Sequence, residues 1–193
     1  VVAIHKKGPI DLCENYWPIS LLNIWYKLFA ALVHKRLVYA GAEDILSSTQ
    51  FGFRSGRSTT DASFVLRRQI DIAWAQRGGT SLIMALDWAK AFDSLNVVSL
   101  IDALRRFGLP TDMLDMLRNL LSARTFVVND CGTFSDARPQ CSGISQGCTL
   151  SPLLFVMAMS VLLTDATAML SAPARSAYER GDLSDVVFAD DTL

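Results

Sequence analysis

The chain has 193 residues, of which 51% are hydrophobic, and it carries 18 basic and 19 acidic side chains for a net charge of −1. This length suits one domain or one and a half, with a sizeable hydrophobic core. The balanced charge argues mildly against a strong grip on nucleic acid, because such binders usually carry a basic excess that neutralises phosphates. Basic residues can still cluster on one face.

No signal peptide is visible, and no stretch reaches the roughly 18 uninterrupted apolar residues that a membrane span requires. We therefore expect an intracellular protein, nuclear or cytoplasmic, with no membrane partner. The chain starts at Val1 and reads as a fragment cut at both ends. With four cysteines, no Cys-x-x-Cys pair and two histidines, free thiols in a reducing compartment are a simpler interpretation than a structural zinc site.

The first half of the chain is predicted to alternate helix and strand. Residues 1–4 read as a strand, and residues 19–38 have the apolar spacing of a helix. Residues 50–58, rich in Gly, Arg and Ser, form a loop. Residues 61–76 are predicted to be a helix with Phe64, Val65, Ile70 and Trp74 on its buried side. The apolar run 81–86 fits a strand that is buried on both faces and ends at Asp87.

The second half is predicted to be mainly helical. Helices are expected at 97–107, which Gly108 and Pro110 stop, and, after a cap at Thr111, through Leu121. A hairpin is expected around residues 129–130, then a long apolar helix at 149–169 and a polar connector at 171–185. A final strand at 186–189 precedes the acidic pair. Because strands and helices are interleaved irregularly, the expected fold class is α+β rather than a doubly wound sheet.

The adjacent carboxylates of Asp190 and Asp191 repel each other, so the pair persists where a divalent cation neutralises it or where both side chains are solvated. A strand that delivers carboxylates to a hairpin tip suits a Mg²⁺ site. An ordinary surface turn is the alternative. If the strand ending at Asp87 pairs with the last strand, three carboxylates would hold two Mg²⁺ ions about 3.5–4 Å apart.

The segment 142–152 also carries candidate chemistry. Gly143 and Gly147 lie on either side of Gln146, and because glycine has no side chain they let the backbone approach a planar ligand closely. The N-terminus of the helix that begins beyond them can support anions. An ordinary junction between a loop and a helix is the alternative interpretation.

Together these motifs resemble the reverse transcriptases of non-LTR (LINE-type) retrotransposons. In chain order the motifs are YWPISLLN at 16–23, QFGFRSGRST at 50–59, LDWAKAFD at 86–93, GISQG at 143–147 with LSP at 150–152, and FADD at 188–191. The resemblance covers essentially the whole chain. It implies a right-hand polymerase fold, with fingers over residues 1–80 and an incomplete palm over 81–193, and no thumb.

The resemblance also implies roles for particular residues and partners. Asp87, Asp190 and Asp191 would hold two Mg²⁺ ions, with Mn²⁺ as a possible substitute, and Phe92 would exclude a 2′-hydroxyl as a steric gate. Two further sets of residues are implied, one that lines the dNTP pocket and one that contacts an RNA template and a DNA primer. The nucleotide set is Lys6, Lys7, Ala91, Phe92, Gln146 and Gly147, and the strand set is Arg54, Arg57, Ser151 and Pro152.

One departure from the family pattern puts activity in doubt. The family motif usually reads Tyr-Arg-Pro-Ile-Ser, and this chain has Trp17 where the arginine is expected to hold the triphosphate. Tryptophan supplies no forked cation, and losing a charged hydrogen bond would cost about 1.5–3 kcal/mol of nucleotide affinity. A degenerate, inactive fragment that at most binds nucleic acid is the main alternative function. A metal-dependent nuclease is weaker, because it leaves Phe92 and the Gln-Gly pair unexplained.

Overall fold

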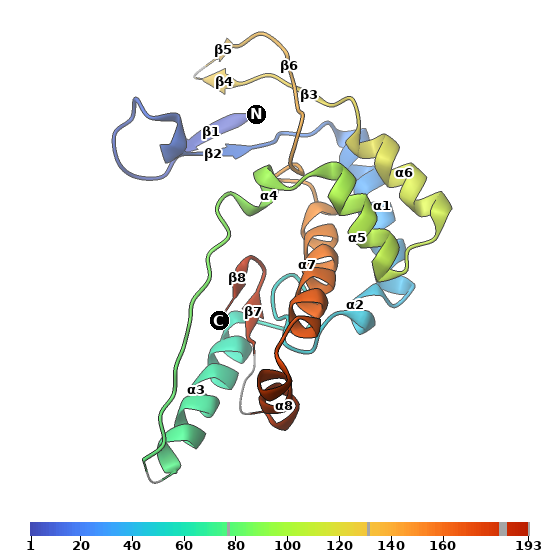
Figure 1. Ribbon diagram of the computed structural model, residues 1–193. Coiled ribbons are helices and arrows are strands. Elements are labelled where there is room, and N and C mark those ends of the chain that lie inside the picture. The colour runs from blue at the N-terminus through green and yellow to red at the C-terminus, as the bar shows by residue number, and fades with distance from the viewer. Residues whose placement is uncertain (77, 131, 182–184, 193) are drawn as a thin grey trace. The chain divides into compact units, whose positions relative to one another are not determined.

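The computed structural model describes residues 1–76, 78–130, 132–181 and 185–192 (Figure 1). Its contacts divide the chain into two compact units that are interleaved in sequence. The first unit contains Val1–Leu37 and Lys90–Ser151, and the second contains Val38–Ala89 and Pro152–Leu193. Each unit mixes helices with short strands, in agreement with the expected combination of helix and sheet.

The first unit contains a four-stranded sheet in the order β2-β1-β4-β5. β1 (Val2–His5) pairs antiparallel with β2 (Tyr16–Ile19) and parallel with β4 (Asn129–Asp130), which pairs with β5 (Thr133–Phe134). Proline lacks a backbone N–H, so Pro18 is compatible with the edge position of β2. The strand predicted at 1–4 is confirmed by β1, whereas β2 was not predicted.

The hairpin predicted around residues 129–130 forms two residues later than expected. Residues 129 and 130 pair with 134 and 133, so they form a strand rather than the turn. β3 (Thr125–Phe126) pairs instead with β6 (Arg138–Pro139). The turn-forming tendency of Asn-Asp yields here to the pairing of β4 with β1. Cys131 lies outside the described residues.

Helix α1 (Ile24–Tyr39) starts later than predicted, after the short 3-10 turn η1 (Cys13–Asn15) and β2. The predicted helix began at residue 19, but that residue ends β2. The side chain of Asn23 accepts a hydrogen bond from the backbone N–H of Tyr26 at 2.7 Å. This contact satisfies a free donor of the first turn, so it fixes the start of the helix.

Helices α5 (Val97–Phe107) and α6 (Thr111–Leu121) pack side by side (Figure 1). The bounds of α5 are as predicted, whereas α6 begins one residue early because Pro110, and not Thr111, is its N-cap. The Asn96 side chain accepts hydrogen bonds from two backbone N–H groups of the first turn of α5. Gly108, with φ at 111°, ends the helix in the left-handed conformation. The short helix α4 (Ala91–Ser94) precedes them. Six buried side chains at helical spacing form their core: Leu100, Ile101, Leu104, Leu114, Leu117 and Leu121.

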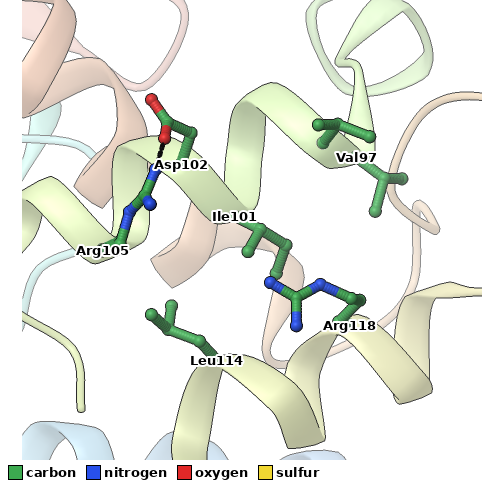
Figure 2. Close-up of a pocket in the computed structure, with 7 residues that line it drawn as sticks. Val97, Ile101, Asp102, Arg105, Leu114 and Arg118 are labelled. Carbon is green, nitrogen blue, oxygen red and sulfur yellow. Dashed lines mark ion pairs between the residues drawn. The ribbon is translucent and has the colours of Figure 1, made fainter. Parts of the chain in front are cut away.

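The pocket in Figure 2 lies between α5 and α6 and has a volume of about 190 Å³. Ile101 and Leu114 give it an apolar floor, while Arg118 and the ion pair of Asp102 with Arg105 lie at its rim. None of the predicted site residues lines it. The pocket is therefore a surface hollow between two helices and not the candidate active site.

Helix α3 (Thr59–Ala75) follows the short α2 (Ala42–Ile45) in the second unit. A capping box begins α3: Ser58 accepts from the backbone N–H of Asp61, and the Asp61 carboxylate accepts from that of Ser58. The predicted buried face is partly wrong, because Phe64 and Trp74 are 69% and 73% exposed. Only a narrow stripe packs inward, since Ala62 is the buried residue of this helix.

The strand predicted at 81–86 is wrong apart from its last residue. Leu82 is 98% exposed and Met84 is 67% exposed, so this run is not buried on either face. Leu86 forms a single bridge to Thr192 in β8 (Asp191–Thr192), which pairs with β7 (Val187–Phe188). A partner strand only two residues long cannot support a longer ladder, so the apolar composition alone does not create a strand here.

Helix α7 (Ser151–Ala168) confirms the long apolar helix predicted at 149–169. Among the described residues it is the one helix long and apolar enough to cross a membrane by length and composition. Most of its first ten residues are buried, as in the core helix of a folded domain. The predicted polar connector contains helix α8 (Ala172–Arg180), and its residues 182–184 lie outside the described part.

The packing of α5 leads to a stability prediction. Leu104 is 0% exposed, so Leu104→Ala should leave a cavity and lower the free energy of unfolding by about 2–5 kcal/mol. Val98, on the same helix, is 78% exposed, and Val98→Ala should change it by less than about 0.5 kcal/mol. Urea unfolding of both variants measures the difference. Equal losses would contradict the observed orientation of α5.

Candidate active site

Asp190 and Asp191 lie in a β-hairpin with a two-residue turn, at the end of the second unit. In the β7–β8 pair, Phe188 lies opposite Asp191, which leaves Ala189 and Asp190 as the turn. Ala189 has φ at 61°, the left-handed region that the favoured two-residue turns require at their first turn residue. Asp190 is half-buried and Asp191 is exposed. A short strand therefore delivers the first carboxylate to a hairpin tip, as predicted.

Asp87 reaches the same hairpin through the bridge between Leu86 and Thr192. The N–H of Leu86 donates to the carbonyl of Thr192 at 2.8 Å, and the reverse bond is 3.2 Å long. Since Asp87 follows Leu86 and Asp191 precedes Thr192, the antiparallel direction puts both on the same side of the bridge. The bridge partner is β8, so the expected pairing with residues 186–189 is wrong. Asp87 nevertheless lies at the same hairpin as Asp190 and Asp191, which is the arrangement that the expected pairing implied.

The three aspartates fit a divalent cation by their donor chemistry. All three side chains are carboxylates, and their oxygens are the hard ligands that Mg²⁺ prefers. Among the residues that the structure describes, however, no three His, Cys, Asp or Glu side chains are gathered closely enough to hold a metal ion. The backbone register brings the three positions to one hairpin, and the side chains are not gathered around one point.

The predicted nucleotide residues form a second group, in the first unit. The loop at 142–146 packs against residues 92–95 through two backbone bonds of 2.8 Å, from Gly143 N–H to Leu95 and from Ile144 N–H to Phe92. A Cβ on Gly143 would lie 2.7 Å from the Asp93 carbonyl oxygen, so this close approach requires glycine. The contacts bring half-buried Phe92 and the Gln146 loop together, as the motifs implied.

Asp93, the last residue of the LDWAKAFD motif, was not among the predicted site residues but contacts one of them. The Gln146 side-chain amide donates to Asp93 Oδ2 at 2.9 Å, across 53 positions of sequence. A hydrogen bond to a carboxylate is stronger than a neutral one and restricts the rotamer of the amide. Asp93 therefore orients Gln146. The one sequence signal was its place at the end of the LDWAKAFD motif.

Gly147 and the edge strand β2 extend this group. The N–H of Ser20 donates to the Gln146 carbonyl at 2.8 Å, and a Cβ on Gly147 would lie 2.8 Å from the Ser20 carbonyl oxygen. Trp17, on β2, is 52% exposed, and the Lys6 ammonium lies 5.4 Å from the centre of its ring. This is within cation–π range. Lys6 and Lys7 are both exposed, whereas the Ala91 side chain is buried.

Arg124 donates side-chain hydrogen bonds to the same loop. Its guanidinium donates to the Gly143 carbonyl at 2.6 Å and to Ser145 Oγ at 3.3 Å. Burial lowers the pKa of Arg124. Burial, followed by the nearby thiol of Cys148, raises the pKa of Tyr26 to about 12. A half-buried cation therefore contacts the glycine-rich loop, and a neutral phenol lies near it.

The predicted strand-binding residues are engaged within the protein. Arg54 donates to the carbonyls of Glu43 and Ser47 at 2.8 and 2.7 Å, and to that of Gln50 at 3.3 Å. Burial lowers the pKa of Arg54. Its hydrogen bonds join the loop at 50–58 to the preceding segment and to α2. Arg57 donates to the Ser48 carbonyl and lies 5.2 Å from the Phe51 ring centre.

The two residues predicted to lie near the template begin helix α7. Ser151 is only 3% exposed, which argues against direct contact of its hydroxyl with a template strand. Pro152 is half-buried and supplies the fixed φ that suits a first helical turn. In this structure both residues serve the start of the helix.

The order and local pairing of these motifs agree with a comparison against known protein families. The model described as "Reverse transcriptase (RNA-dependent DNA polymerase)" matches residues 4–193. This chain belongs to the reverse transcriptase family. Reverse transcriptases share a polymerase fold, use divalent metal ions, and act on an RNA template with a DNA primer.

Individual relatives of this reverse transcriptase chain come from mobile elements. It is 32% identical over 184 residues to the "Probable RNA-directed DNA polymerase from transposon BS" of Drosophila melanogaster, covering 94% of this chain and 19% of that protein. It is 34% identical over 193 residues to the Pol polyprotein of the retrotransposable element R2DM of the same organism, covering 100% and 17%. The resemblance to non-LTR retrotransposon enzymes is thereby confirmed, and the chain spans about a fifth of these relatives.

The contact between Asp93 and Gln146 can be measured in this reverse transcriptase chain without any activity. In a double-mutant cycle, Asp93→Ala and Gln146→Ala should show a coupling in the free energy of unfolding of about 1 kcal/mol, because both groups are half-buried. Asn119→Ala, on α6, should be additive with Asp93→Ala. Additivity of the first pair would show that the hydrogen bond does not hold Gln146.

Proposed function

We propose that this chain is the nucleotidyl-transfer core of an RNA-directed DNA polymerase that extends a primer 3′-hydroxyl with dNTPs. The observation that supports it most is the register of the hairpin, which brings Asp87 and Asp191 to the same side of one backbone bridge next to Asp190. Three carboxylates at one sheet end are a suitable ligand set for two Mg²⁺ ions, with Mn²⁺ as a substitute. When bound, such ions lower the pKa of an attacking hydroxyl and stabilise the leaving pyrophosphate.

The first unit would select the incoming nucleotide. Phe92 would lie under the sugar and leave no space for a 2′-hydroxyl, so dNTPs would be preferred over ribonucleotides. Gln146, oriented by Asp93, and the open backbone at Gly147 would line the pocket. Lys6 and Lys7 would face the triphosphate, with Ala91 contributing through its backbone because its side chain is buried. The assignment of residues 1–80 to fingers and 81–193 to palm belongs to the same proposal, as does an intracellular site of action.

The carboxylate assignment predicts the effect of one substitution. In a longer polypeptide that contains this chain together with a thumb, Asp190→Asn should reduce Mg²⁺-dependent primer extension by about a thousandfold or more. A metal ligand contributes several kcal/mol to transition-state stabilisation, and each 1.36 kcal/mol is tenfold in rate. Asp71→Asn, at an exposed aspartate of α3, is the matched control and should leave the rate unchanged. Extension that survives Asp190→Asn would refute the proposed site.

The alternative, an inactive descendant that at most binds nucleic acid, is favoured by a specific observation. Trp17 occupies the place of the family's arginine, and its exposed ring already has the Lys6 ammonium 5.4 Å above it. A ring with one neighbouring ammonium cannot grip a triphosphate as a forked guanidinium does. This leaves nucleotide affinity low even where the carboxylates are intact.

Restoring the arginine discriminates between the two functions. Trp17→Arg in the longer polypeptide should lower the KM for dNTP by about 10- to 100-fold, which corresponds to the 1.5–3 kcal/mol of a charged hydrogen bond. Trp25→Arg, at an exposed tryptophan of α1, adds the same charge elsewhere and should leave KM unchanged. Equal effects of the two variants would mean that position 17 does not face the triphosphate.

A further inference from the structure

Gln50 is a large polar side chain buried in the second unit, with 1% of its surface exposed. Its Oε1 accepts two backbone hydrogen bonds, from the N–H of Gly52 at 2.8 Å and from the N–H of Ala189 at 3.1 Å. Its Nε2 has no partner among the described residues. Burying an amide is costly unless it is hydrogen-bonded, so the two bonds to the oxygen determine where this side chain can lie.

The backbone around Gln50 is joined to the strand that leads into the aspartates. The N–H of Val187 donates to the Thr49 carbonyl at 2.9 Å, and the N–H of Phe51 donates to the Val187 carbonyl at 2.7 Å. These bonds form a parallel bridge between Gln50 and Val187. Two residues further on, a Cβ on Gly52 would lie 2.1 Å from the backbone nitrogen of Ala189, which only glycine permits. Segment 49–52 is therefore fitted directly against β7 and its turn.

Ala189 needs such support because of its backbone conformation. A left-handed φ is unfavourable for a residue with a Cβ, by roughly 1–2 kcal/mol, and persists where the surroundings hold it. Ala189 is the first turn residue, so it has no partner in the β7–β8 register, and it is only 5% exposed. The Gln50 oxygen is the acceptor for that N–H, one residue before Asp190.

The loop that carries Gln50 is itself anchored. Arg54 donates to the carbonyls of Ser47 and Gln50 and also to that of Glu43 in α2. The Phe51 side chain packs with Ala62 of α3 and with Val186, next to β7. The backbone that carries the Gln50 side chain is thus held by hydrogen bonds and by hydrophobic packing.

We propose that Gln50 is a positioning residue: its buried amide oxygen fixes the backbone at Ala189 and thereby sets the direction of the Asp190 and Asp191 carboxylates. This role in catalysis rests on the function proposed above, whereas the hydrogen bond to Ala189 does not. Misplacing a reacting group by about 1 Å can lower the rate about a hundredfold. The conformation of this turn would therefore affect the rate of primer extension.

The first test measures amide hydrogen exchange in the 193-residue chain, without any activity. The Ala189 amide should exchange as slowly as that of Phe51, because both open only when this packed segment opens. Gln50→Met keeps a similar volume but removes the acceptor, and it should speed exchange at Ala189 by about tenfold or more relative to Leu104. Gln50→Glu keeps an oxygen at the same reach and should restore most of the protection. Ser160→Ala, at another buried polar residue of this unit, should leave Ala189 unchanged.

The second test measures primer extension in the longer polypeptide. Gln50→Met should lower kcat by about 10- to 100-fold with little change in the KM for dNTP, because the turn and not the nucleotide pocket is loosened. Gln50→Glu should recover part of the loss, and Ser160→Ala should cost nothing.

Several outcomes would overturn the proposal. Fast exchange of Ala189 in the unaltered chain would overturn it, even if Gln50→Met failed to fold. A uniform increase at Ala189 and Leu104 in Gln50→Met would show a loss of global stability and no positioning. Faster exchange confined to Ala189 with unchanged kcat would remove the catalytic role. If instead Asp190→Asn leaves extension intact while Ala189 loses protection in Gln50→Met, the proposed function fails and the hydrogen bond stands.

Discussion

The second unit depends on backbone hydrogen bonding to a hairpin of only four paired residues. β7 receives segment 49–51 along one edge, and β8 receives Leu86 through a single bridge. A two-stranded ribbon of this length is not stable by itself in water, so these flanking bonds and the packing of Phe51 against Val186 hold it in place. The direction of Asp190 and Asp191 therefore depends on segments more than a hundred residues earlier in the chain.

In the first unit, glycines allow segments that are distant in sequence to pack main chain against main chain. At Gly143 and Gly147 a Cβ would collide with the backbone at Asp93 and Ser20, so the loop at 142–147 lies directly on two other motifs. This contact allows the Gln146 amide to reach the Asp93 carboxylate, and Arg124 donates to the Gly143 carbonyl of the same loop. Motifs that are separate in sequence thus form one surface through close approach of main chains. The same pattern recurs at Gly52 in the second unit.

Sequence reasoning succeeded where the determinants are local. The helix at 97–107 was predicted to the residue and the helix at 111–121 to within one residue, because apolar spacing and the Gly108 stop act within a few positions. It failed where tertiary contacts override composition. Phe64 and Trp74 have helical spacing and are nevertheless exposed, and the apolar run at 81–86 lacks a ladder partner beyond Leu86. The two predicted strand-binding arginines have backbone carbonyls as partners, which no local pattern indicates.

The sequence by itself determined the family, the candidate carboxylates and the order of the motifs, because these depend on residue identity and spacing. Only the tertiary structure decided which residues support them. The bond from Ala189 to Gln50 spans 139 positions and that from Gln146 to Asp93 spans 53. Hydrogen-bond partners so far apart are chosen by the fold of the main chain, and a glutamine in a loop motif carries no local sign that it will be buried against the turn before the aspartate pair.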